Sequence, residues 1–297
     1  FYDLYWKSSF ILVGTPSGIT LSPEGAQHGW KSDIQIPNQI TWEPTYCQEF
    51  DWILCDAIKR HLSGDNEGRT GVLIRGVTKG IDQKPFLKLL KTQKRFKADL
   101  ADGELLHHSD FAINGAIDES QKDSAPEGQI LQQIREDVLA GGYYLINYEG
   151  YAGYEPGDNV VNIIAMGSLT EEAVKASNDL LERGIYANVL VVTSPDLLLG
   201  NLAYENNYHH LRNNLGVNAD LHIQPGTANE AGDFVSVAGR RIPIVTVHDG
   251  EPGLLDNAGS IVGVKNEALA VRKHSKCGTP SDIFAYHGID SDSIVRA

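Results

Sequence analysis

The stretch SPEGAQH, residues 22–28, brings together residue types that could move protons during a reaction. His28 ionises near neutral pH, and a nearby carboxylate such as Glu24 favours its charged form. Gly25 and a second glycine directly after His28 let the backbone approach a ligand closely, while Pro23 stiffens the entry to the loop. The residues alone leave two interpretations open: a loop that holds His28 and Glu24 over a reacting molecule, or an ordinary surface loop.

Other motifs of catalysis or ligand binding are missing from the sequence. It has no GxxxxGK[ST] phosphate loop, no GxSxG nucleophile elbow, and no HExxH or Cys/His metal knuckle. Gly167 and Ser168 stand between a strand and a helix, where an anion could bind, but this arrangement is common in α/β proteins. The histidine pair 107–108 is interpreted as solvated loop residues. The pair 209–210 points in two directions on a helix, which argues against a shared metal.

Composition narrows the class of protein. The formal net charge of -14 opposes binding to the phosphate backbone of nucleic acids. No apolar run approaches twenty residues, and no signal peptide is visible, so we expect a cytoplasmic protein without a membrane span. Phe1 and the single methionine suggest a piece of a longer protein. Three widely spaced cysteines fit neither a disulfide framework nor a metal knuckle, and each is predicted to be a small buried residue: Cys47, Cys55 and Cys277.

Around SPEGAQH, the sequence predicts one α/β unit. An apolar run at residues 10–14 predicts a buried strand, residues 46–61 have helical spacing, and residues 71–77 predict the next strand. Residues 86–128 are polar or basic, and we interpret them as a linker or an insertion. The apolar face of the helix is predicted to comprise Phe50, Ile53, Leu54 and Ile58.

A second α/β unit is predicted from residue 129 onward. Thr170 is the expected N-cap of one of its helices, and Gly184 the residue that ends that helix. Alternation of strands and helices predicts a mostly parallel sheet with helices on both faces. The predicted helices are 128–142, 169–184 and 282–297, and the predicted strands are 143–149, 159–168, 186–194 and 242–250.

Two blocks of sequence resemble a known enzyme family. FILVGTPSGITLSPEGAQH, followed by IPNQITWEPTY, resembles the pyrimidine-binding domain of homodimeric pyruvate dehydrogenases. RIPIVTVHDGEPGLLDNAGSIVGV and the closing HSKCGTPSDIFAYHGIDSDSIVRA resemble the C-terminal domain of transketolase-type enzymes. The resemblance implies an α/β fold in which residues 1–85 form part of a thiamine-enzyme pyrimidine-binding domain, residues 86–128 a linker or insertion, and residues 129–297 the transketolase-type C-terminal domain.

This family decarboxylates 2-oxo acids on thiamine diphosphate and passes the acyl group to a lipoyl-lysine of an acyltransferase partner. Its loop histidine lines the reaction pocket and matches His28, and its loop glutamate matches Glu24, a supporting acid. A pocket tyrosine of the family corresponds to Tyr2. The family also implies a homodimer.

The sequence departs from the family at the cofactor anchor. A GDG motif followed by the usual asparagines, which binds Mg²⁺ and the diphosphate, is missing, and only the fragments SGDNEG and EPGDNVV come near it. We therefore expect the residues that anchor thiamine diphosphate and Mg²⁺ to lie outside this chain, and the chain alone to be inactive. Two alternatives stay open: a transketolase or deoxyxylulose phosphate synthase that acts on sugar phosphates, and a non-catalytic dimerisation or regulatory module.

Overall fold

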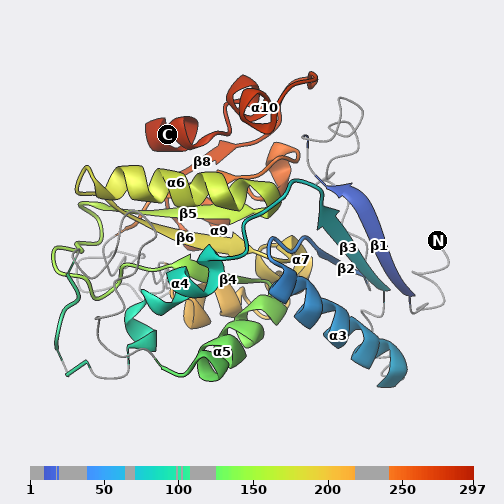
Figure 1. Cartoon of the computed structure of the whole chain (residues 1–297), viewed down its shortest axis with the longest axis horizontal. Coiled ribbons are helices and arrows are strands. Elements are labelled where there is room, and N and C mark those ends of the chain that lie inside the picture. The colour runs from blue at the N-terminus through green and yellow to red at the C-terminus, as the bar shows by residue number, and fades with distance from the viewer. Residues whose placement is uncertain are drawn as a thin grey trace, which may run out of the picture.

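The computed structural model describes residues 10–17, 19, 39–63, 71–97, 100–101, 103–107, 125–217 and 241–297, and all structural statements below refer to these residues. They form two mainly parallel sheets with helices packed around them (Figure 1). The predicted α/β class with mostly parallel sheets is therefore confirmed.

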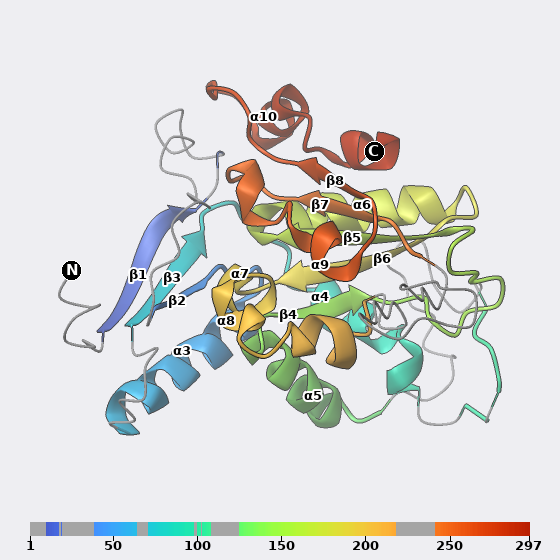
Figure 2. The same ribbon diagram turned by 180° about the vertical axis from the view of Figure 1, so that it is seen from behind.

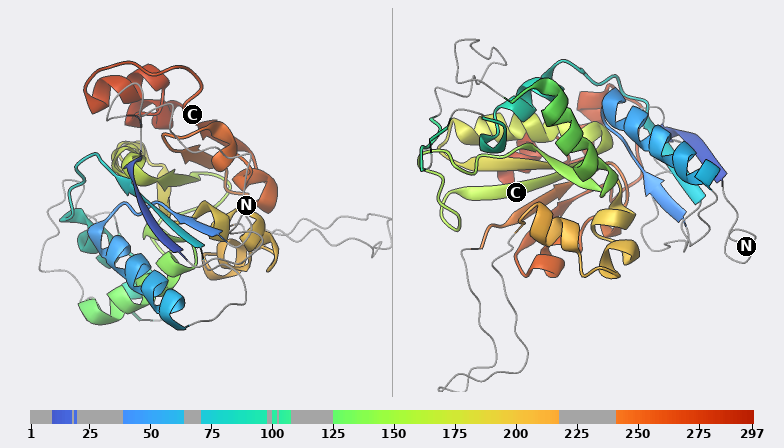
Figure 3. Two further views of the ribbon diagram at one scale, coloured as in Figure 1. Left: turned by 90° about the vertical axis from the view of Figure 1, so that its right-hand side faces the viewer. Right: turned by 90° about the horizontal axis from the view of Figure 1, so that it is seen from below.

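The first sheet has three parallel strands in the order β1-β3-β2. Its central strand is the apolar run GVLIRGV, which buries Val72 and Ile74 on one face and leaves Leu73 and Arg75 of the other face half-buried. Helix α3 (Cys47–Ser63) packs against this sheet and lies beside α5 (Glu127–Leu139) of the second unit (Figure 3). The strands are β1 (Phe10–Ser17), β2 (Gln39–Trp42) and β3 (Gly71–Val77).

The second sheet has five strands in the order β4-β6-β5-β7-β8. All neighbouring pairs are parallel except β4 and β6, which run antiparallel. Helix α6 (Thr170–Leu181) packs against β5 and β6, and α11 (Ser291–Arg296) packs against α6. Helix α10 (Pro280–His287) comes just before α11 (Figure 1). The strands are β4 (Gly142–Ile146), β5 (Val160–Met166), β6 (Tyr186–Val192), β7 (Ile244–Val247) and β8 (Asn266–Leu269).

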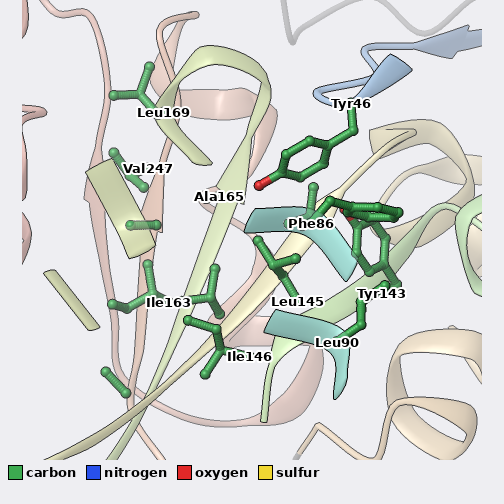
Figure 4. Close-up of a cluster of buried hydrophobic side chains, with 14 of the residues drawn as sticks. Tyr46, Phe86, Leu90, Tyr143, Leu145, Ile146, Ile163, Ala165, Leu169 and Val247 are labelled. Atoms are coloured by element: carbon green, nitrogen blue, oxygen red, sulfur yellow. The ribbon is translucent and has the colours of Figure 1, made fainter. Parts of the chain in front are cut away.

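Both faces of the second sheet are buried. Successive residues of a strand point to opposite faces, so each strand can contribute side chains to both cores. On β5, Ile163 and Ala165 join the larger core with α6, part of which Figure 4 shows. Ile164 and Met166 join a second core on the other face. That face is covered by α7 (Pro195–Leu198), the π-helical turn His210–Asn214 and α9 (Ala258–Val262). The short helix α8 (Asn201–Tyr204) follows α7, and α7, α8 and α9 are labelled in Figure 2.

Hydrogen bonds from two backbone amides join the two sheets at the outer edge of β2. The amide of Thr41 donates to Asp196 Oδ2 at 2.7 Å, and the amide of Glu43 donates to the carbonyl oxygen of Thr193 at 2.9 Å. These bonds satisfy amides that an edge strand would otherwise leave open. Residues 193 and 196 come after β6, so the first sheet is fixed to the carboxyl end of the second.

The strand predicted at residues 10–14 is present as part of β1, but it is not buried: Leu12 is 56% and Val13 49% exposed, because β1 is an edge strand of the first sheet.

Three further details of the sequence interpretation are wrong. The helix at residues 46–61 is present, and Phe50, Ile53 and Leu54 of its predicted apolar face lie in or against the core, but Ile58 is 43% exposed. Trp52 and Ala57, which were not predicted, are buried instead. The reason is the helical repeat, which places residue 58 about 100° beyond residue 57 and past the edge of the buried face.

The cysteines are free but all exposed rather than buried. Cys47 begins α3, Cys55 lies on the outer side of the same helix, and Cys277 lies in the loop before α10. Thr170 is the first residue of α6 rather than its N-cap, and its hydroxyl contacts the Thr45 hydroxyl at 3.1 Å instead of capping the helix.

The predicted linker or insertion contains buried apolar side chains where it is described. Helix α4 (Pro85–Lys91) places Phe86 and Leu90 in the main core, and Phe96 comes after them with 1% exposure. The domain boundaries at 85 and 128 stay a prediction. No helix in the described part of the chain is both long enough and apolar enough to cross a membrane.

Candidate functional site

A buried polar cluster lies where the strands of both sheets end. The chain leaves β5 through α6 to β6 on one side and later enters β7 on the other side, so the carboxyl end of β5 is a topological switch point. Ligands of open α/β sheets bind at such points. Four residues gather there, and we call them the switch-point cluster: Glu43, Arg75, Ser168 and Asp249.

Two members of the cluster come from neighbouring strands of the second sheet. Ser168 lies just after β5, Asp249 lies just after β7, and the Ser168 hydroxyl donates to Asp249 Oδ2 at 2.6 Å. Ser168 is 1% exposed and Asp249 2% exposed. Because β5 and β7 are parallel neighbours, their carboxyl ends must meet at one edge of the sheet, and this pairing brings the hydroxyl and the carboxylate together.

The other two members come from the first sheet. Glu43 comes directly after β2 and is fully buried, and Arg75 lies on β3. Arg75 Nε is 3.7 Å from Glu43 Oε2. The carboxylates of Glu43 and Asp249 both act electrostatically on the guanidinium.

Burial is the largest influence on the pKa of Asp249 and on that of Arg75. It raises the pKa of Asp249, while the Ser168 hydroxyl, the backbone amides of Ile19 and Asp249, and the charge of Arg75 counteract the rise. Burial also lowers the pKa of Arg75, against the opposing effect of Glu43 and then Asp249. The cluster is thus a set of mutually dependent charges: each carboxylate is stabilised by donors or by the one guanidinium.

Gly167 packs closely against Glu43 of the cluster. The residue has a φ of +56°, and a Cβ at this position would overlap Glu43 Oε1. The Thr45 hydroxyl donates to the Gly167 carbonyl oxygen at 3.2 Å and contacts the Thr170 hydroxyl. A glycine is therefore required here for both its conformation and its size.

A second buried carboxylate holds the start of α3. Glu49 accepts hydrogen bonds from the backbone amides of Thr45 at 2.5 Å and Tyr46 at 3.1 Å, and from the hydroxyl of Tyr143 on β4. Burial raises the pKa of Glu49 to about 7, although these three hydrogen bonds act in the opposite direction. Glu49 is fully buried, so its charge is a cost of the fold at high pH.

The Glu49→Gln variant should change how stability depends on pH. A carboxyl group whose pKa rises from 4.5 to about 7 on folding binds more protons in the folded state, so the free energy of unfolding falls as pH rises through this range. Relative to Glu49→Gln, we expect the wild-type protein to lose up to about 3 kcal/mol across that window. Urea unfolding at several pH values measures this. The exposed control Glu136→Gln should match the wild-type profile, and a parallel profile for Glu49→Gln would contradict the assignment.

The structure describes only some of the site residues predicted from the sequence. His28, Glu24 and Tyr2 lie outside the described residues, and their roles stay predictions. His107 is exposed, and His108, the other member of the pair 107–108, lies outside the described residues. His209 is exposed, whereas His210 is buried with Nε2 2.7 Å from the Gly142 carbonyl oxygen. The prediction that the pair 209–210 points in two directions is thus confirmed.

The sequence interpretation missed three of the four cluster residues. It singled out Ser168 as a residue near a helix start, but assigned nothing to Glu43, Arg75 or Asp249. A signal was present: Arg75 is the one charged residue in the apolar strand GVLIRGV, and a charge at such a position needs a buried partner.

The described residues do not form an anchor for Mg²⁺. No group of three or more His, Cys, Asp or Glu side chains that could hold a metal ion occurs among them. The carboxylates of the switch-point cluster are turned toward Arg75 and Ser168. The cluster can fix charges and backbone amides in place, but it does not offer a metal the free oxygen ligands it requires.

No protein-family model and no curated protein matches the chain. Among solved structures, the chain is similar to a transketolase mutant from Pichia stipitis, with a TM-score of 0.50 and 14% identity over 97% of this chain and 30% of the other. A split-gene transketolase, an inactive beta4 tetramer, has a TM-score of 0.46 and 16% identity over 96% and 64% of the two chains. Campylobacter jejuni transketolase has a TM-score of 0.41 and 11% identity over 87% and 26%.

The likeness to the first structure is one of fold. The chain has a transketolase-type α/β fold and spans 30% of the length of the Pichia stipitis chain.

Proposed function

We propose that the protein containing this chain is a pyruvate dehydrogenase-like enzyme. It decarboxylates a small 2-oxo acid with thiamine diphosphate and Mg²⁺, and transfers the acyl group to a lipoyl-lysine of an acyltransferase partner. It works in the cytoplasm as a homodimer. The observation that carries the proposal is the order GTPSG, then EGAQH, then IPN at residues 14–38, and the transketolase-type fold supports it.

In this proposal, His28 is the catalytic residue that exchanges protons with the reacting molecule. Its ordinary ionisation near neutral pH suits it to act as an acid and as a base in one cycle. Glu24 favours the charged form of His28, and Tyr2 lines the pocket. The cofactor supplies the electron sink for decarboxylation.

A second candidate function is the transfer of two-carbon units between sugar phosphates. It is favoured by one observation, that the similar solved structures are transketolases. The two functions differ in the groups that must be bound. A sugar phosphate needs basic side chains for its phosphate group, whereas pyruvate has no phosphate group and presents only a small carboxylate.

A direct assay separates the two functions. The complete protein, purified from its own cells, is supplied with thiamine diphosphate and Mg²⁺ and offered either pyruvate with an artificial electron acceptor or a pair of sugar phosphates. We expect turnover with the 2-oxo acid and not with the sugar phosphates. The reverse result would replace the proposal with the transketolase-type function.

A further inference from the structure

A short basic segment follows the last strand of the second sheet. Residues 271–278, VRKHSKCG, contain three positively charged side chains and no aspartate or glutamate. The three are Arg272, Lys273 and Lys276, and all are exposed. Because the protein as a whole has a formal net charge of -14, the charge of this segment is opposite in sign to that of the chain. We call residues 271–278 the basic segment.

Two lysines of the basic segment share one aromatic ring. The ammonium nitrogen of Lys273 lies 3.8 Å from the centre of the Tyr286 ring on α10, and that of Lys276 lies 4.6 Å from it. The ring attracts each ammonium, so it holds two like charges close together. None of the carboxylates in the described part of the chain forms an ion pair with either lysine. Two positive charges are thus presented at the surface with no described acid to balance them.

Hydrogen bonds between the basic segment and α10 hold this arrangement in place. The Tyr286 hydroxyl donates to the His274 carbonyl oxygen at 3.4 Å. Ser275 is 4% exposed, and its hydroxyl oxygen is 3.2 Å from Nε2 of His287. The lysines therefore project from a backbone that is fixed on both sides of the ring. A surface arranged in advance loses little conformational freedom when a partner binds to it.

The basic segment begins at the end of the second sheet that carries the switch-point cluster. β8 runs parallel to β7, so the segment leaves the sheet at the carboxyl end of both strands. The amide of Val271 donates to the carbonyl oxygen of Gly250 at 2.9 Å, and Gly250 directly follows Asp249 of the cluster. Figure 2 shows β8 at the edge of the sheet with α10 beyond it. A molecule bound to the basic segment would be held at the same end of the sheet as the cluster.

The exposure of these side chains indicates which kind of anion they can hold. An exposed ion pair strengthens binding by a factor of about five at most, so a small anion that meets one or two of these lysines would bind weakly. A peptide with several carboxylates in succession can pair with all three basic side chains at once. A nucleic acid also carries successive charges, but the net charge of -14 opposes binding of its long phosphate backbone. The observations therefore favour an acidic peptide.

We propose that the basic segment is a docking surface for an acidic stretch of a partner protein. Lys273 and Lys276 supply the charges that attract it, and Tyr286 keeps these charges together. Opposite charges on two surfaces speed their association and select the partner. The inference does not depend on the proposed function, because the chemistry assigned to His28 uses no residue of the basic segment.

Binding of a fluorescein-labelled octaglutamate peptide to the complete protein tests the proposal by fluorescence anisotropy. We expect binding at low salt that weakens as salt is added, since exposed charges are screened. The double variant Lys273→Ala/Lys276→Ala should weaken it about 10-fold. Tyr286→Leu keeps both charges but removes the ring, and should weaken it about two- to fivefold. Octaglutamine, which has the same length and no charge, should not bind.

Lys59 and Lys84 provide a matched control, because both are exposed and lie outside the basic segment. The double variant Lys59→Ala/Lys84→Ala removes the same charge and should leave the affinity within about twofold of the wild type. Equal affinities of the wild-type protein and Lys273→Ala/Lys276→Ala would overturn the proposal, as would a wild-type protein that does not bind octaglutamate. Tighter binding of a single-stranded oligonucleotide, or displacement of the peptide by an equal concentration of inorganic phosphate, would assign the surface to another anion and overturn it too.

Discussion

The His28→Ala variant is expected to turn over a 2-oxo acid about 10²–10⁴ times more slowly than the wild-type protein, because a positioned acid–base group contributes a factor of that size. This corresponds to roughly 3–5 kcal/mol of activation free energy. Stability should change little, since a histidine that serves the reaction is not required by either core. Steady-state kinetics with pyruvate and a thermal melt of the same preparations measure both effects.

His209→Ala is the matched control for this experiment. His209 is exposed and lies on a segment after β6 that takes no part in the proposed chemistry. Its removal should leave kcat within about twofold of the wild type. If His28→Ala also stays within that range, His28 is not the acid–base group.

The Arg75→Met variant is expected to lose about 3–5 kcal/mol of unfolding free energy, the cost of leaving buried carboxylates without their cation. Methionine keeps much of the volume of the arginine stem, so the loss reports charge rather than a cavity. The loss should shrink at acidic pH, because burial raises the pKa of Asp249 and its protonation removes an uncompensated charge. Chemical denaturation at two pH values measures the effect.

Two further variants test the cause of this loss. Adding Glu43→Gln to Arg75→Met removes one of the buried charges and should recover part of the stability. Arg60 pairs with Asp56 on the surface of α3 and is 45% exposed, so Arg60→Met should cost at most about 1 kcal/mol. A similar small loss in Arg75→Met would show that Arg75 does not balance the cluster.

Local patterns were sufficient to predict most elements. Apolar runs such as GVLIRGV and NVVNIIAMGS predicted strands, and the regular spacing between residues 46 and 61 predicted α3. These signals depend only on neighbours in sequence. The orientation of α3 was predicted less well, because several apolar residues lie around the helix and only tertiary packing selects Trp52 and Ala57 for the interior.

The candidate site could be predicted only in part. Glu43, Arg75 and Asp249 are separated by 32 and 174 residues in sequence, and only the order of strands in the two sheets brings them together. Ser168 was noticed because a strand and a helix meet there, but its partner is not visible in the sequence. His28 and Glu24, in contrast, were found from a local motif, and their place in the site stays a prediction.

The release of labelled carbon dioxide from carboxyl-labelled pyruvate tests the central claim most directly. With the complete protein, thiamine diphosphate and Mg²⁺, we predict release that depends on the cofactor and falls about 10²–10⁴-fold in His28→Ala. No release from pyruvate or another small 2-oxo acid, under conditions in which sugar phosphates exchange two-carbon units, would contradict the account.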